Sequence, residues 1–146
     1  MRRDGRLARM LHVLVHMDKR GGNTTSETIA LMLETNPVVV RRTMASLKDA
    51  GLVRSEGGHG GGWTLLRDLG TITIRDVHEA LGAPRALALD AVADHPACPV
   101  EQCVIARLDA IFDATEAFML QMMGDTTLDR IAADVDARVR TAGTQD

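Results

Sequence analysis

The stretch from Asn36 to Gly51 is the most strongly specified element of the chain. Asn36 suits the position before a helix, where its side chain accepts from free backbone N–H groups, and Pro37 suits the first helical position. Gly51 stands where a helix commonly ends in a left-handed residue. Spacings of four and three residues predict one apolar face, made by Val40, Met44 and Leu47.

The other faces of this helix are basic, with small or methyl-bearing neighbours. The major groove of DNA accepts such a surface, because cations meet phosphates while small apolar groups meet base edges. An ordinary amphipathic helix with a solvated basic side is the alternative. The candidate DNA contacts are the cationic Arg41, Arg42 and Lys48 and the smaller Val38, Val39, Thr43 and Ala45.

Two further helices are expected before this one. Apolar residues at helical spacing predict a helix over 4–19, whose Arg6 and Arg9 are candidate contacts to the DNA backbone. A capping-box pattern follows, with Thr24 as the cap and Glu27 reaching back, and opens a helix to about Glu34. A short helix, a tight polar turn and a basic second helix form a helix-turn-helix.

A glycine-rich turn over 57–62 separates two short segments, 52–56 and 63–66, and the first of them is partly β-branched and follows Gly51. This pattern predicts a β-hairpin, and a hairpin directly after a recognition helix is a wing. The expected contacts at the wing tip are Gly58, His59 and Gly60. A phosphate loop for a nucleotide is the alternative, but it requires a helix after the glycines and often Gly-Lys-Ser/Thr, and the sequence has neither.

From Pro99 to Gly124 apolar residues recur at helical spacing, which predicts a helix of roughly 37 Å at 1.5 Å per residue. Such a helix is longer than a winged domain can cover, so we expect a second copy to cover its apolar side. Packing of this side on its own domain is the alternative. A last helix is expected to start at 126–128.

The predicted fold is therefore mainly α with a small β-hairpin. We expect a winged helix-turn-helix DNA-binding domain over 1–82 and a flexible connector or sensor segment over 83–98. Dimerisation helices are expected over 99–137, and a disordered tail over 138–146.

Charge divides the 146 residues unevenly, since residues 1–66 carry a net +4 and residues 67–146 a net −7. A basic first half suits a polyanionic partner. The sequence shows no membrane span and no signal peptide, and two cysteines are too few for a disulfide framework. A cytoplasmic protein without a membrane partner is expected. No nucleophile–base pair or metal-ligand spacing points to an enzyme.

Four stretches carry a resemblance to a known family: Asp4–Ala8, Asn36–Arg42, Gly51–Val53 and Gly57–Leu65. They resemble the Rrf family of bacterial winged helix-turn-helix regulators, which includes IscR and NsrR. Thr35–Arg42 together with Cys98-Pro99-Val100 is most similar to its cluster-free YwnA-like branch. The resemblance implies a homodimer that crosses its long C-terminal helices. It also implies recognition helices in adjacent major grooves of a palindromic operator, with wings in the minor groove.

The cysteines depart from the family's cluster-binding members, which carry three where this chain has Cys98 and Cys103. Because a cluster usually requires four ligands, no cofactor is predicted. An iron–sulfur cluster supplemented by His95 and Glu101 is the alternative. Cys98 precedes a helix start, which favours the thiolate, so the two cysteines are redox or sensor candidates. An inert Cys98 and a core Cys103 are equally compatible with the sequence.

The sequence thus predicts a homodimeric, sequence-specific transcriptional repressor that binds DNA without iron. It would respond to redox change or a small molecule through the Cys98 region. The alternative is a dimeric ligand-binding or interaction module that keeps the fold without DNA binding.

Overall fold

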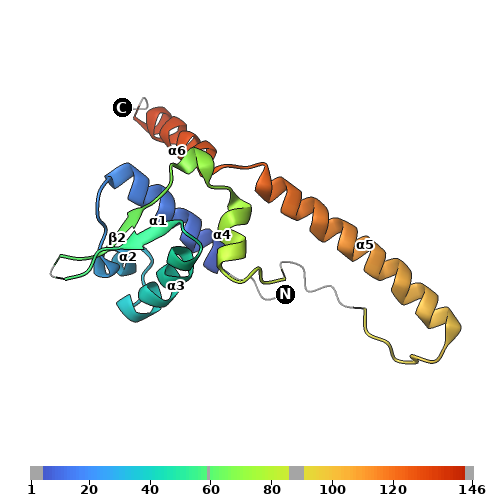
Figure 1. Ribbon diagram of the computed structural model, residues 1–146. Coiled ribbons are helices and arrows are strands. Elements are labelled where there is room, and N and C mark those ends of the chain that lie inside the picture. The colour runs from blue at the N-terminus through green and yellow to red at the C-terminus, as the bar shows by residue number, and fades with distance from the viewer. Residues whose placement is uncertain (1–4, 59, 86–90, 144–146) are drawn as a thin grey trace.

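The computed structural model describes residues 5–58, 60–85 and 91–143. Its helices are α1 (Arg6–Arg20), α2 (Ser26–Met32), α3 (Pro37–Asp49), α4 (Ile74–Ala80), α5 (Pro99–Gly124) and α6 (Leu128–Ala142), its strands are β1 (Val53–Ser55) and β2 (Trp63–Leu65), and a short 3-10 turn, η1, spans Leu69–Thr71. Helices α1–α4 and the hairpin form a compact body, α5 extends away from it, and α6 returns beside α1 (Figure 1). The predicted mainly helical fold with a small hairpin is confirmed.

Local signals explain the bounds of α3. The Asn36 side chain accepts from the backbone N–H groups of Val38 and Val39 at 3.0 and 3.1 Å, which satisfies two donors of the first turn. Gly51 has a φ of 74°, as a left-handed residue after a helix requires. The predicted apolar face is buried, and it comprises Val40, Met44 and Leu47.

The start of α2 differs from the prediction by one residue. Thr25, and not Thr24, caps the helix by accepting from the Thr28 N–H at 3.1 Å. Thr24 is instead paired with Trp63 through two backbone hydrogen bonds of 2.8 and 2.9 Å, so it extends the ladder of the hairpin. This pairing moves the cap one position along the chain. Glu27 does not reach back to the cap, and α2 ends at Met32, before the expected Glu34.

The hairpin pairs β1 and β2 antiparallel, with Arg54 opposite Thr64, and each strand is shorter than predicted. Two of its glycines are required by the close approach of other backbone. A Cβ atom on Gly61 would lie 2.3 Å from the Glu56 carbonyl oxygen, and one on Gly62 would lie 2.5 Å from that of Thr24. The base of the wing therefore rests directly on the segment before α2.

The core of the body is closed without any residue of α5. Its fully buried side chains come from the other helices and the hairpin and include Leu14, Met17, Ile29, Met44, Leu47, Val53, Val77 and Leu128. Backbone hydrogen bonds from Ile74 to Thr126 and from Leu128 to Ile72 attach the α5–α6 junction to this body. Burial of this apolar set stabilises the body independently of α5.

Helix α5 leaves the body with no buried residue. Its exposed apolar residues are Val100, Val104, Leu108, Ile111, Phe118 and Met122. Within the described ranges no helix has both the length and the apolar character that crossing a membrane needs.

The prediction of a disordered tail over 138–146 is wrong for its first part, because α6 extends into it. This helix continues to Ala142 and so includes five of the residues, 138–142, that were expected to be disordered. Two arginines and one alanine, which favour helix, are among these five residues, and Gly143 follows them at the C-cap. Residues 144–146 of the predicted tail lie outside the described residues.

The connector over 83–98 is only partly described, since 86–90 lie outside the described residues. Its final part is attached to the first turn of α5. The Glu101 carboxylate accepts from the N–H groups of Asp94 and His95, and Gln102 donates to the Pro96 carbonyl at 2.9 Å. The segment directly before α5 is thus held by side chains of α5 itself.

Candidate nucleic-acid interface

The predicted DNA contacts of α3 lie outside the buried face of the helix, with Val38, Arg42 and Ala45 on the opposite side. Val38 and Val39 are exposed, with 61% and 47% of their surface accessible, and Ala45 is exposed as well. Thr43 is half-buried, and its hydroxyl donates to the Val39 carbonyl within the helix. Apolar surface exposed on a capped helix is available to base edges and thymine methyl groups.

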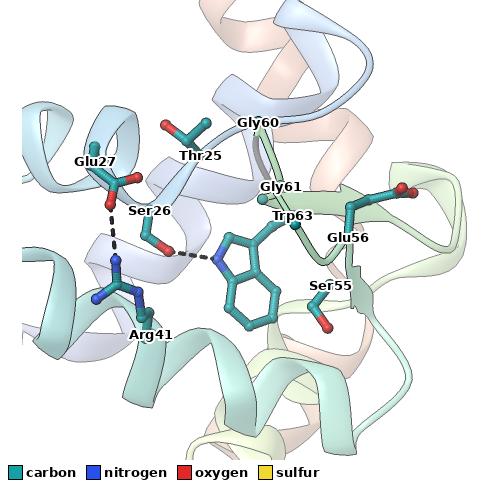
Figure 2. Close-up of a pocket in the computed structure, with 11 residues that line it drawn as sticks. Thr25, Ser26, Glu27, Arg41, Ser55, Glu56, Gly60, Gly61 and Trp63 are labelled. Carbon is teal, nitrogen blue, oxygen red and sulfur yellow. Dashed lines mark hydrogen bonds and ion pairs between the residues drawn. The ribbon is translucent and has the colours of Figure 1, made fainter.

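Arg41 is the cation that the structure places most specifically. Its Nη2 donates to Oε1 of Glu27 at 2.9 Å, which joins α3 to α2 (Figure 2). Both side chains are more than half exposed, so solvent screens this ion pair and it adds little to stability. Its consequence is geometric: the guanidinium is held beside the first turn of α2.

The other two cations of α3 have different surroundings. Lys48 lies beside the wing, where its Nζ donates to the Ser55 hydroxyl on β1 at 3.0 Å. Arg42 is exposed and has no ion-pair partner among the described residues. Of the three predicted cations, only Arg41 is in an ion pair, so the charges of Arg42 and Lys48 are not offset by an acidic partner among the described residues.

The wing turn bends at Gly58 and Gly60, whose φ angles are 86° and 76°. These left-handed conformations favour glycine at both positions. His59, the predicted projecting residue of the wing, lies outside the described residues.

Two further side-chain hydrogen bonds hold the wing against the helix-turn-helix, in addition to the Thr24–Trp63 backbone pairing and the Lys48–Ser55 bond. The Trp63 indole N–H donates to the buried Ser26 hydroxyl at 3.0 Å, and the Asn23 side-chain amide donates to the Gly60 carbonyl at 2.7 Å. Sequence reasoning missed both contacts, together with the Arg41–Glu27 pair. They join residues far apart in the chain, so no local pattern could have found them.

A polar cleft of about 420 Å³ lies where the recognition helix, the start of α2 and the wing meet. Figure 2 shows Arg41, Glu27 and the Trp63 indole around it. Its lining comprises Thr25, Ser26, Glu27, Arg41, Ser55, Glu56, Gly58, Gly60, Gly61, Gly62 and Trp63. A guanidinium beside exposed glycine backbone is a suitable surface for a phosphate group.

The remaining predicted residues lie apart from this cleft. Arg6 and Arg9 are exposed on the first turns of α1, and neither lines the cleft. Cys98 is half-buried at the start of α5, with no capping hydrogen bond from its side chain. Cys103 is exposed and lies in an apolar groove along α5, so the alternative of a core residue is wrong for the single chain.

A capped basic helix, a preceding short helix and a glycine-rich hairpin together define a winged helix-turn-helix regulator that binds DNA. Comparison with known proteins identifies the family. The chain belongs to the Rrf2 family, described as iron-dependent transcriptional regulators, which matches residues 4–134. The predicted family is thereby confirmed, and the protein is a DNA-binding transcriptional regulator.

Individual relatives agree with this assignment. YwnA of Bacillus subtilis, which carries the name of an HTH-type transcriptional regulator, is 32% identical over 127 residues, covering 86% of this chain and 92% of YwnA. The fold is similar to that of T. potens IscR, with a TM-score of 0.67 at 17% identity over 92% of this chain and 88% of IscR. For B. subtilis CymR the TM-score is 0.62 at 23% identity, over 91% and 97%.

The family's description names iron, so the donor set of this chain bears on whether it holds an iron centre. The chain has two cysteines, and no group of three or more His, Cys, Asp or Glu side chains suited to a metal ion occurs within 5–58, 60–85 and 91–143. A cluster usually requires four protein ligands. The described residues of one chain therefore do not fit an iron–sulfur cluster.

Proposed function

We propose that the protein is a homodimeric transcriptional repressor that binds a palindromic operator through α3 and the wing. The observation that supports this proposal is the exposed face of α3, which carries Arg42 and Val38 beside a wing anchored through Trp63. A recognition helix needs such a face, and an anchored wing fixes its approach to the neighbouring groove.

In this proposal the residues of α3 divide into two roles. Val38, Val39 and Ala45 lie near base edges, while Arg41, Arg42 and Lys48 contact phosphates or guanines. Arg41 reaches a phosphate from the cleft, where its ion pair with Glu27 directs it. Gly58, His59 and Gly60 contact the minor groove, and Arg6 and Arg9 contact the backbone.

The dimer follows from α5, whose apolar side has no cover within the described chain. A second copy crossing its own α5 would bury this side. A two-fold protein also matches the two half-sites of a palindromic operator. We therefore assign 1–82 to DNA binding, 83–98 to a connector with a sensing role, and α5 with the beginning of α6 to dimerisation.

Replacing Arg41 and Arg42 by Ala tests the DNA-binding surface. Binding would be measured by fluorescence anisotropy, over 50–300 mM salt, on the site selected by the wild-type protein from random double-stranded DNA. Each lost phosphate contact lowers the slope of log K against log salt by about 0.9, so a change of roughly 2 per protomer is expected, with affinity at least about tenfold weaker.

Arg138→Ala on α6 is the matched control, because it removes an exposed cation far from α3 in the chain. It should keep the wild-type slope. An unchanged slope for the α3 double variant would contradict the proposed surface. A wild-type protein that selects no DNA sequence would instead favour a fold that serves as an interaction module.

For the signal, we propose that Cys98 responds to oxidation while the iron-free protein binds DNA. Cys98 lies directly before α5, and Glu101 and Gln102 hold the same segment, so a modified thiol would disturb this junction. Mild peroxide should weaken operator binding by wild type and by Cys103→Ser, but not by Cys98→Ser. DNA binding only by protein with stoichiometric iron and sulfide would overturn this mechanism.

A further inference from the structure

Helix α1 presents a pair of histidines that the proposed function does not use. His12 and His16 are one helical turn apart, and their ring centroids lie 4.6 Å from each other with the planes tilted by 59°. Both residues are exposed, and neither ring has a hydrogen bond to another described residue. Two imidazoles four residues apart on one helix face are a recognised arrangement for binding one metal ion.

The ring separation suits a metal ion between them. A metal lies about 2.0 Å from an imidazole nitrogen and hence about 3.2 Å from the ring centre. Two ring centres 4.6 Å apart then subtend about 90° at the metal. This is the angle between neighbouring ligands in octahedral or square-planar coordination, which Ni²⁺ and Cu²⁺ adopt.

The electrostatics of the pair keep an imidazole in the form that binds a metal. Partial burial lowers the pKa of His16 below its ordinary value, and His12, Arg20 and Lys19 lower it further. The neutral ring, which has a free nitrogen lone pair, is thereby favoured at neutral pH. The nearby cations oppose a bound metal ion, but the Lys19 charge is offset by an ion pair with Asp136 of α6.

The pair also lies at the junction of two elements. His12 and His16 border a largely apolar groove of about 390 Å³ between α1 and α6, together with Leu11, Val15 and Ile131. An ion bound to both rings would fix one turn of α1 beside α6. Because α1 supplies much of the body's core, this would stabilise the folded protein by ligand binding.

We propose that His12 and His16 chelate one divalent transition-metal ion of the Ni²⁺ or Cu²⁺ type, with water in the remaining coordination positions. The site is separate from the cysteines and independent of DNA binding. It differs from the family's iron in its ligands, since it uses imidazole nitrogen and no thiolate.

A titration of the untagged protein with Ni²⁺, in which binding is measured by isothermal titration calorimetry, tests this site. The background carries Cys98→Ser and Cys103→Ser, so that thiolates do not contribute. We expect one ion per chain and a rise in Tm with Ni²⁺. Either His12→Ala or His16→Ala should weaken binding at least about tenfold, since the second ligand then no longer acts at high effective concentration. Both side chains are exposed, so each variant should fold.

His95→Ala is the matched control, because it removes an exposed histidine far from α1 in the sequence. It should bind Ni²⁺ as the background does. Paramagnetic broadening by Cu²⁺ should affect amide signals around residues 12–16 first. Two results would overturn the proposal. One is saturable Ni²⁺ binding that persists in both the His12→Ala and the His16→Ala variant. The other is a background protein whose dissociation constant for Ni²⁺ is not below 1 mM (roughly −4 kcal/mol).

Discussion

Gly62 joins the wing to the body because its backbone lies directly against the segment before α2. A Cβ atom there would lie 2.5 Å from the Thr24 carbonyl oxygen and 2.8 Å from the Asn23 side-chain oxygen. The backbone oxygen cannot move without breaking the pairing of Thr24 with Trp63. The glycine is therefore needed for space, whereas Gly58 and Gly60 are favoured by their positive φ angles.

Gly62→Ala should accordingly destabilise the body. Overpacking of this kind costs about 1–3 kcal/mol in the free energy of unfolding, measured by urea denaturation. Gly57→Ala is the control, since nothing lies within 4 Å of a Cβ at that position, and its effect should stay within about 0.5 kcal/mol. Equal stability of the two variants would show that the wing base is not packed as described.

The residues around Thr24 show why sequence reasoning failed at this scale. Thr24 and Thr25 are equally good caps, and Glu27 stands at the right distance from Thr24 for a capping box. Two long-range contacts decided between them: the pairing of Thr24 with Trp63 and the ion pair of Glu27 with Arg41. Neither contact leaves a signal in the local sequence.

At the scale of elements, the helices whose ends carry their own signals were predictable. Asn36 and Gly51 bound α3 through local backbone chemistry, and Thr73 with Asp76 forms a capping box at the start of α4, with hydrogen bonds of 2.8 and 3.1 Å. Helix α6 also has a glycine directly after its last residue, Gly143 at the C-cap, and the predicted end before residue 138 was wrong because it did not use this signal.

The relation between α3 and the wing is also a property of elements, and here the sequence was less informative. The order of a basic helix and a glycine-rich hairpin indicated a wing. It did not indicate that Trp63 would hold the wing to α2 through Ser26, or that Arg41 would be directed into the cleft between them. The candidate surface was therefore predictable as a set of residues but not as a geometry.

At the scale of the whole molecule, the body and α5 have opposite relations to solvent. The body closes its core with Leu128 of α6, while α5 exposes Val104, Ile111 and Phe118 along one side. The apolar spacing after Pro99 predicted that α5 carries more apolar surface than its own domain covers. Because α5 contributes nothing to the body's core, substitutions on it should change assembly without unfolding the body.

Ile111→Glu should separate the dimer. Ile111 is 59% exposed in the single chain, and burying a charge at the centre of an apolar interface is strongly unfavourable. We expect a dimer for wild type and a monomer for the variant, by light scattering at about 10 µM. Operator affinity should fall at least about 100-fold, since the two half-sites no longer bind as a unit.

Ala106→Glu is the matched control, because it adds the same charge to an exposed position on the opposite side of α5. It should remain dimeric and bind the operator as wild type does. Circular dichroism should show equal helix content in both variants, since neither position contributes to the body's core. A dimeric Ile111→Glu variant with wild-type operator affinity would exclude this side of α5 as the interface.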